Sequence, residues 1–335
     1  MKILGIESSC DETAVSIIEF DENRNVKVLA DIVSSQIDIH KEFGGVVPEI
    51  ASRQHIKNIS AVLDEALEVS NTKLEELCAI AVTVGPGLVG ALLVGVSFAK
   101  ALAYSLNIPI VPVHHIAGHI AANYITNAEL KSPFLSLVVS GGHSHIILVE
   151  DYCKFKILAR TRDDAVGEAF DKVARVLGLG YPGGPKVSKK AELGEDTYKL
   201  PTTKFEENLD FSFSGIKTAV MNIANKEKDN LRIADMCCSF ENNVVNVLVD
   251  HVITCAKQNN IQSIALAGGV SANKKLRKVL DEQGKKNNIK VYMPELKYTT
   301  DNATMITMAG VLNYLDGKYT KDLSLNARAS LNIED

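Results

Sequence analysis

The sequence predicts an α/β protein of two domains with duplicated mixed sheets and a central cleft. Three observations support this fold class. The chain has 335 residues, which is long for one hydrophobic core and comfortable for two. Short apolar runs alternate with long amphipathic segments, as in α/β units. Three strands followed by alternating helices and strands occur twice, and we expect ligands to bind between the two copies.

The first copy is expected to form an N-terminal domain of residues 1–128. It begins with strand-like apolar runs separated by polar turns, and its later apolar runs alternate with helical segments. The expected strands are residues 2–7, 14–20, 26–33, 79–84 and 109–113, and the expected helices are 48–70, 88–106 and the segment after residue 113.

The second copy is expected to form a C-terminal domain of residues 129–304, after which residues of about 305–335 pack back on the first domain. Its expected strands are residues 134–140, 144–149, 154–160, 263–267 and 290–293, and its expected helices are 165–177, 216–224, 231–258 and 272–285. A last helix is expected at 302–315, where the chain returns to the first domain. Residues of about 178–230 read as a loop-rich insertion, because Pro182-Gly183-Gly184-Pro185 and a lysine-rich stretch interrupt any regular period.

The composition indicates an ordinary soluble globular protein, with 46% apolar and 23% charged residues. The six cysteines form no Cys-x-x-Cys pair, which favours the reducing cytoplasm. The amino terminus lacks the long apolar run of a signal peptide. Residues 79–106 are apolar, but Gly85-Pro86-Gly87 and Lys100 interrupt them, so we expect packed core elements and no membrane association.

The net charge of −5 is unevenly distributed along the chain. Residues 1–150 carry a net charge of −8 and residues 151–335 one of +3, and residues 251–300 alone carry +6. This basic block is compatible with a nucleic-acid partner. On charge alone a solvated helix surface is the favoured interpretation, and a nucleic-acid partner is the alternative.

His115 and His119 are the most informative pair in the chain. Four residues apart on a helix, they present both imidazoles on one face to a single metal ion. The zinc-protease signature has the same spacing but needs a glutamate directly after the first histidine, where this chain has Ile116. We therefore expect a metal that holds a substrate. Asp301 is either the cap of the helix that follows it or a third ligand.

Two short turns are candidates for binding a phosphate. Residues 8–13 and 140–144 are rich in serine or glycine and occupy equivalent places in the two copies. The pair Gly268-Gly269 lies between a strand and a helix start, which suits either a bound phosphate or a tight turn. It lacks the Gly-x-Gly-x-x-Gly spacing, which disfavours a dinucleotide site.

Seven short motifs occur in order along the chain. They are GIESSCDET (5–13), PEIASR (48–53), GPGL (85–88), HHIAGH (114–119), VSGGH (139–143), SFSG (212–215) and Asp301-Asn302-Ala303. Together they resemble the TsaD family of bacterial tRNA threonylcarbamoyladenosine biosynthesis proteins, once classed as glycoprotein endopeptidases, and the resemblance runs essentially from end to end. It implies the actin-like fold of sugar kinases and chaperone ATPases, which agrees with the duplicated pattern.

The resemblance implies an acyltransferase that acts on tRNA. It would transfer the threonylcarbamoyl group from threonylcarbamoyl-AMP to the exocyclic amine of the adenosine adjacent to the anticodon, releasing AMP. His115, His119 and Asp301 would bind one divalent metal, Fe²⁺ or alternatively Zn²⁺. The implied substrate-binding residues are Val138, Val139, Ser140, Gly141, Gly142, Asp171, Gly184 and Asn273.

Glu12 is our candidate for proton removal, because it ends the first polar turn. The implied partners, besides tRNA, are TsaB, a non-catalytic relative, and TsaE, a small ATPase. Three other functions remain open at this stage. An actin-like ATPase or kinase suits the phosphate turns but not the histidines, since Mg²⁺ prefers oxygen ligands. A metalloprotease lacks its glutamate, and a non-catalytic scaffold would not need the histidine pair.

Overall fold

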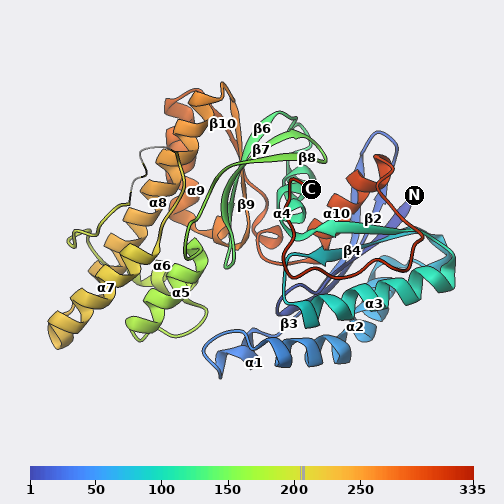
Figure 1. Cartoon of the computed structure of the whole chain (residues 1–335), viewed down its shortest axis with the longest axis horizontal. Helices are drawn as coiled ribbons and strands as arrows, with labels where there is room; N and C mark the ends of the chain where they lie inside the picture. The colour runs from blue at the N-terminus through green and yellow to red at the C-terminus, as the bar shows by residue number, and fades with distance from the viewer. Residues whose placement is uncertain (204, 206–207) are drawn as a thin grey trace. The chain divides into compact units, whose positions relative to one another are not determined.

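The computed structural model describes residues 1–203, 205 and 208–335, which form two compact units (Figure 1). Unit 1 comprises residues 1–130, 152–154 and 294–335, and unit 2 comprises residues 131–151 and 155–293. The chain thus rejoins unit 1 at Pro294, earlier than the expected position near 305. At this junction the backbone N–H of Glu295 donates to Thr126 Oγ1 over 3.1 Å. As a result, Asp301 belongs to the same unit as the two histidines.

Unit 1 contains a five-stranded sheet of order β3-β2-β1-β4-β5. β1 pairs antiparallel with β2 and parallel with β4, and the register aligns Ile6 with Val15 and Val82. The strands are β1 (Lys2–Glu7), β2 (Glu12–Phe20), β3 (Val26–Ser35), β4 (Leu77–Gly85) and β5 (Ile110–His114). The α-helices are α1 (Ile37–Lys41), α2 (Pro48–Ser70), α3 (Val89–Leu106), α4 (His115–Thr126) and α10 (Ala303–Leu315), and short 3₁₀ turns are η1 (Leu74–Glu76) and η4 (Leu296–Tyr298).

Helix α10 packs closely on the sheet and on α4 because glycines face it. A Cβ at Gly118 of α4 would lie 2.6 Å from Ile306 Cδ1, and a Cβ at Gly5 of β1 would clash with Thr307. Such contacts leave no room for a larger side chain at either position. They fix the start of α10, and with it Asp301, relative to the helix that carries His115 and His119.

Unit 2 repeats this strand order, with a five-stranded sheet β10-β9-β6-β7-β8. β6 pairs antiparallel with β7 and parallel with β9. The strands are β6 (Phe134–Val139), β7 (Ser144–Asp151), β8 (Lys154–Arg160), β9 (Ser263–Ala267) and β10 (Lys290–Tyr292). The helices are α5 (Val166–Val176), α6 (Gly183–Ala191), α7 (Ser214–Glu227), α8 (Ile233–Gln258) and α9 (Lys274–Lys286), with 3₁₀ turns η2 (Lys228–Asn230) and η3 (Gly269–Ala272).

The expected loop-rich insertion of residues 178–230 is partly helical. Its Pro-Gly-Gly-Pro stretch opens α6 instead of forming a loop. Proline is tolerated in a first helical turn, where its missing N–H would have no intrahelical partner. A Cβ at Gly183 would lie 2.6 Å from the Cα of Asp171, so glycine allows α6 to approach α5. Residues 204, 206 and 207 of the expected insertion lie outside the described residues.

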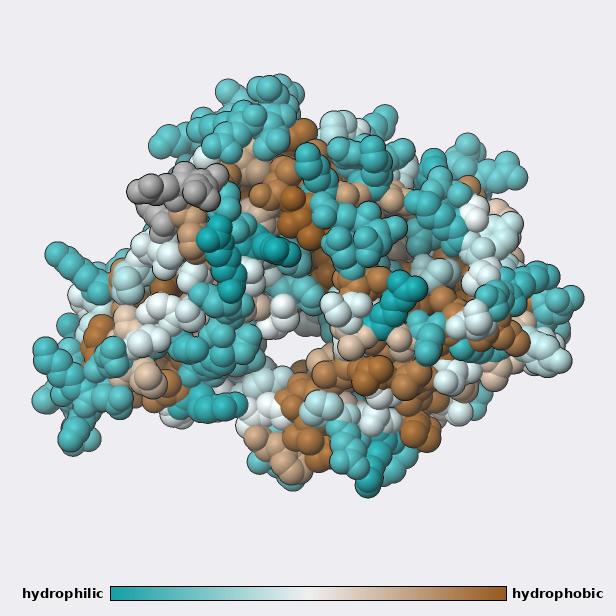
Figure 2. All heavy atoms as spheres, viewed as in Figure 1, coloured by the Kyte–Doolittle hydropathy of each residue, from teal (hydrophilic) through white to brown (hydrophobic). Residues whose placement is uncertain are grey.

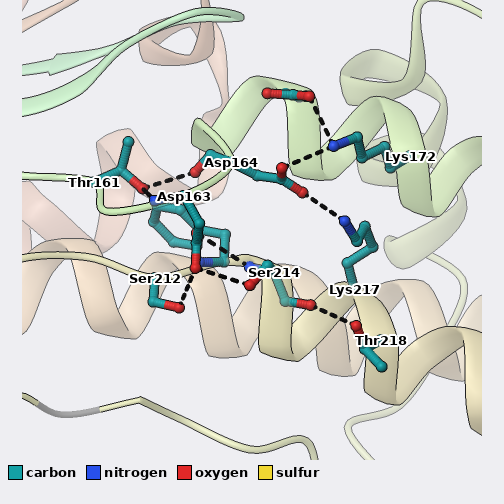
Figure 3. Close-up of polar contacts among 10 residues, drawn as sticks. Thr161, Asp163, Asp164, Lys172, Ser212, Ser214, Lys217 and Thr218 are labelled. Atoms are coloured by element: carbon teal, nitrogen blue, oxygen red, sulfur yellow. Dashed lines mark hydrogen bonds and ion pairs between the residues drawn. The ribbon is translucent and has the colours of Figure 1, made fainter.

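The SFSG motif anchors α7 to the loop before α5 (Figure 3). The carboxylate of Asp163 accepts hydrogen bonds from the Ser214 hydroxyl (2.8 Å), the Phe213 backbone N–H (2.8 Å) and the Ser212 hydroxyl (2.5 Å). Burial opposes ionisation, but these bonds hold the pKa of Asp163 below its usual range. Asp163 therefore caps α7 from a distant part of the sequence.

Helix α3 is the one helix among the described residues with the length and apolar composition needed to cross a membrane. It is a core helix of unit 1. Its small buried residues pack over β4, and Val96 and Ala99 join the same hydrophobic cluster as Ile80 and Val82.

Candidate metal centre

His115, His119 and Asp301 lie together in unit 1. β5 runs directly into α4, so His115 is the first residue of the helix and His119 lies one turn further on. The Oδ1 atom of Asp301 is 3.2 Å from His119 Nε2 and 3.7 Å from His115 Nε2. The structure thus brings the three residues that the sequence singled out into one candidate metal site, with ligand atoms within 4.8 Å of one another.

Asn302, and not Asp301, caps α10. Its Oδ1 atom accepts the backbone N–H of Met305 over 2.9 Å. This resolves the alternative that the sequence left open, because the capping role belongs to the neighbouring residue. The carboxylate of Asp301 instead faces the two imidazoles.

The donor set fits a divalent cation. Two atoms that each lie about 2.1 Å from one ion are about 3–4 Å apart, and the separations of Asp301 Oδ1 from both Nε2 atoms fall in that range. The His119 side chain is fully buried. Its Nε2 atom lies close to the Asp301 carboxylate but makes no hydrogen bond of good geometry among the described residues. Burial of an unsatisfied nitrogen is costly, and a cation bound to Nε2 would satisfy that atom.

Glu7 orients His115 for such a role. The Glu7 Oε2 atom lies 3.2 Å from His115 Nδ1 and also accepts the Thr83 hydroxyl over 2.7 Å. A carboxylate only accepts, so Nδ1 carries the hydrogen and Nε2 is left to bind a metal. Carboxylate–histidine pairs of this kind fix the tautomer in metal sites. The sequence did not reveal this role, because only the sheet order places β1 beside β4 and the start of α4.

Because of the charges around His115, a proton and a metal ion compete for its imidazole. Burial alone would lower the pKa of His115, but the carboxylates of Asp301 and Glu7 raise it to about 9. Burial would likewise raise the pKa of Glu7, but His115 holds it below its ordinary value. A metal bound to Nε2 therefore replaces a proton at neutral pH.

The polar turn of residues 8–13 is held in place by internal bonds. His55 Nε2 donates to the Cys10 carbonyl over 3.0 Å, which leaves Nδ1 to accept the Thr13 hydroxyl over 2.7 Å. Ser8 Oγ donates to the Ala91 carbonyl, and Ser9 Oγ lies 3.1 Å from His115 Nδ1. The hydroxyls that we expected to bind phosphate thus make contacts within unit 1, and that of Ser9 lies against the metal site.

Glu12 is the first residue of β2, beside this turn. Ser35 Oγ donates to its Oε1 over 3.3 Å. Burial, followed by the nearby charges of Asp301 and Asp11, raises the pKa of Glu12 well above its usual value. A carboxylate with a raised pKa is better suited to accept a proton than an ordinary surface glutamate.

The glycine-rich turn predicted for substrate binding joins β6 to β7 in unit 2. Val138 and Val139 are buried in β6. Ser140 closes the turn, since its N–H donates to the His143 carbonyl over 2.8 Å and its own carbonyl accepts the Gly167 N–H. A Cβ at Gly141 or Gly142 would meet no atom within 4 Å. The turn therefore offers exposed backbone at the start of α5.

The other three predicted substrate residues lie around α6. Asp171 of α5 accepts the Gly183 N–H at the start of α6 over 2.7 Å, and Gly184 is the second residue of that helix. Asn273 caps α9 and also donates to Ser188 Oγ (3.0 Å) and Glu241 Oε1 (2.7 Å). These side chains are engaged with their own unit, so any substrate contact by Asn273 uses groups that already have partners.

Comparison with known proteins identifies the family. The model of the family described as "TsaD: tRNA N6-adenosine threonylcarbamoyltransferase" matches residues 27–308. The chain belongs to the TsaD family. Two relatives are named tRNA N6-adenosine threonylcarbamoyltransferase. The protein from Clostridium perfringens (strain SM101 / Type A) is 53% identical over 336 residues, which cover 99% of this chain and 98% of that protein. The protein from Caldicellulosiruptor saccharolyticus is 50% identical over 331 residues, which cover 98% of this chain and 97% of that protein. The chain is thus a transferase that makes threonylcarbamoyladenosine in tRNA, as the motifs predicted.

Two solved structures establish the fold class. Full-length HypF in the phosphate- and nucleotide-bound form has a TM-score of 0.62 at 15% identity, over 94% of this chain and 55% of that chain. Component A of (R)-2-hydroxyglutaryl-CoA dehydratase from Acidaminococcus fermentans has a TM-score of 0.53 at 16% identity, over 95% and 99%. At these identities the likeness concerns the fold alone, and it confirms the predicted actin-like class.

Proposed function

We propose that this TsaD-family transferase uses threonylcarbamoyl-AMP as its donor and modifies the adenosine adjacent to the tRNA anticodon. The exocyclic amine attacks the carbamoyl carbon, a C–N bond forms, and the C–O bond to the phosphate of AMP breaks. The amine proton leaves, and AMP carries away the negative charge. The donor is a mixed anhydride and already activated, so the reaction needs no covalent enzyme intermediate.

The observation that carries this proposal is the convergence of His115, His119 and Asp301, supported by Glu7. Two imidazoles and one carboxylate leave open positions for oxygen atoms of a ligand, a donor set typical of Fe²⁺ and also found with Zn²⁺. We propose Fe²⁺, with Zn²⁺ as the second choice. When bound, the cation would anchor and polarise oxygens of the threonylcarbamoyl part.

The protein's own residues would then position the amine and remove its proton. An aromatic amine is a weak nucleophile, so orientation contributes much of the rate enhancement. Glu12 is the proposed proton acceptor, and the raised pKa of its half-buried carboxyl favours that role.

For the nucleotide part of the donor we propose the predicted residues of unit 2. The exposed backbone of Gly141 and Gly142 suits an approach by phosphate oxygens. Val138, Val139 and Ser140 would line the same turn, and Asp171, Gly184 and Asn273 would complete the site through α6.

We propose TsaB and TsaE as protein partners, in the cytoplasm, which six free cysteines favour. Figure 2 shows apolar residues gathered over α2 and α3. Ile56 is 65% exposed, Val69 59% and Val89 51%. Apolar clusters of this kind on a surface mark protein interaction sites, and TsaB, as a relative with a similar fold, is the proposed occupant.

A reconstituted reaction tests the proposal. The protein, its partners, the adenylate-forming enzyme, threonine, bicarbonate, ATP and unmodified tRNA are incubated together, and the tRNA is digested for mass spectrometry. We expect threonylcarbamoyladenosine with the wild-type chain and none with His115→Ala or His119→Ala. Equal product from the wild type and both variants would refute the proposed role of the metal site.

A further inference from the structure

His114, the residue before the first histidine of the metal site, is itself held by two opposite bonds. It is the N-cap of α4, where its Nδ1 accepts the backbone N–H of Ile116 over 3.1 Å. Its Nε2 lies 3.2 Å from the carbonyl oxygen of Leu331. A carbonyl only accepts, so Nε2 carries the hydrogen and Nδ1 is available for the cap. The Leu331 contact thus selects the tautomer that can cap α4.

Leu331 belongs to a segment that we term the C-terminal strap, residues 327–333. In Figure 1 it is the dark red chain that leads to the C-terminus near α4. The Arg328 N–H donates to the Val84 carbonyl over 2.7 Å, and the Gly87 N–H donates to the Ala329 carbonyl over 3.1 Å. Leu331 packs against the core of unit 1. The strap therefore lies across the end of β4 and the start of α4.

The GPGL motif is shaped to receive this strap. Gly85 has a φ of +155°, and a Cβ there would clash with the Arg328 carbonyl. A Cβ at Gly87 would lie 2.6 Å from the Ser9 carbonyl oxygen, which accepts the Leu88 N–H over 2.8 Å. The strap thus bears on a loop that holds Ser9, and Ser9 Oγ is 3.1 Å from His115 Nδ1.

Both contact routes end at His115, one through the cap of α4 and one through Ser9. We propose that His114, oriented by the C-terminal strap, is a positioning residue that sets the imidazole of His115 for metal binding. The inference rests on the metal site proposed above. It gives the strap and the GPGL motif a role in cation affinity that is separate from binding tRNA or the donor.

Substitutions at His114 separate the cap from the strap contact. His114→Ala removes both bonds. In His114→Asn the side-chain oxygen still accepts the Ile116 N–H, as asparagine does at helix N-caps, but the shorter side chain loses Leu331. Lys321→Ala is the matched control, since Lys321 lies in the same C-terminal region and bonds Asn107 instead. A chain ending at residue 326 removes the strap altogether.

The measurement is Zn²⁺ affinity of the metal-free proteins by calorimetry, with hydrogen exchange of the Ile116 amide as a second readout. We expect His114→Ala to weaken Zn²⁺ binding about tenfold, in line with the loss of groups that support metal ligands. His114→Asn should retain most of the Zn²⁺ affinity, and its Ile116 amide should exchange as slowly as in the wild type. Lys321→Ala should match the wild type in both measurements. The shortened chain should itself bind Zn²⁺ more weakly than the wild type, because His114 loses the Leu331 bond that selects its capping tautomer. His114→Asn should not weaken binding further in that background, since asparagine caps without the strap.

Two results would overturn the proposal. One is Zn²⁺ affinity and Ile116 exchange in His114→Ala equal to those of the wild type. The other is a loss in His114→Asn as large as that in His114→Ala, because the cap would then not matter. His115→Ala distinguishes this failure from failure of the metal site itself. If His115→Ala binds Zn²⁺ as well as the wild type, the metal site is wrong. If it does not, and His114→Ala binds normally, only the positioning role is wrong.

Discussion

Glu7→Gln is the substitution that most sharply tests how the metal site is organised. Glutamine has nearly the same shape, but its amide can accept at one atom only. In the protein, Glu7 accepts from His115 Nδ1 and Thr83 at Oε2 and from the Ser9 N–H at Oε1. The glutamine NH₂ group would face a hydrogen-bond donor whether it takes the place of Oε1 or of Oε2. At least one of these bonds is therefore lost, and His115 is less firmly oriented.

The expected loss of metal affinity is about 10–100-fold, or about 1.4–2.7 kcal/mol, as for other groups that orient metal ligands. Its pH dependence follows from His115, whose pKa of about 9 means that a proton competes with the metal. Below that pH, the affinity of the wild type should rise about tenfold per pH unit. The substitution lowers the pKa of His115 by removing a carboxylate. Each pKa unit of that decrease weakens proton competition and restores a factor of about ten in metal affinity near pH 7. The difference in affinity between the variant and the wild type is therefore largest above pH 9.

The assay is anaerobic titration of metal-free protein with Fe²⁺, repeated with Zn²⁺, between about pH 6 and 9.5, the range spanned by histidine protonation in the site. Glu49→Gln is the matched control, because the Glu49 side chain is exposed and forms a surface ion pair with Arg53 over 2.6 Å. We expect the control to follow the wild type at every pH. Equal affinities and equal pH slopes for Glu7→Gln and the wild type would show that Glu7 does not orient His115.

Three further substitutions test other parts of the account. Asp163→Ala should lower the free energy of unfolding by about 0.5–2 kcal/mol, as for a lost helix cap. Because the pKa of Asp163 is depressed, this stabilisation is present above about pH 4 and disappears on acidification. Equal urea midpoints for the variant and the wild type at neutral pH would contradict the capping role. Glu12→Gln should reduce the rate of tRNA modification about 10²–10⁴-fold with metal content unchanged, and a near-normal rate would exclude Glu12 as the proton acceptor. Ile56→Glu should weaken TsaB binding about tenfold or more, whereas the neighbouring surface change Lys57→Ala should not; equal binding by both would remove α2 from the proposed interface.

The local elements and the family were accessible from the sequence. Alternating apolar runs predicted the strands of both sheets, and the motifs predicted the TsaD family and the actin-like fold. The pairing of His115 and His119 could be predicted because residues four apart on a helix lie on the same face. Asp301 joined them as a hypothesis, and the structure brings its carboxylate to within 3.2 Å of His119.

Features that depend on the pairing of distant segments were not accessible. Glu7 acquires its role because β4 lies beside β1 and ends near α4, a neighbour relation that local periodicity does not encode. Asp163 caps a helix that begins at Ser214, and its neighbours in the sequence give no sign of this partner. The Pro-Gly-Gly-Pro stretch looked like a loop because composition alone does not show the close contact that draws Gly183 onto α5.

The metal content of the protein purified without oxygen is the decisive measurement for the proposed centre. We expect about one divalent metal ion per wild-type chain, with two imidazole nitrogens and carboxylate oxygen as ligands in the X-ray absorption spectrum. We expect almost no metal in His119→Ala, which should retain the wild-type circular dichroism spectrum. A folded His119→Ala protein with full metal content, or a wild-type spectrum without imidazole ligands, would contradict the account.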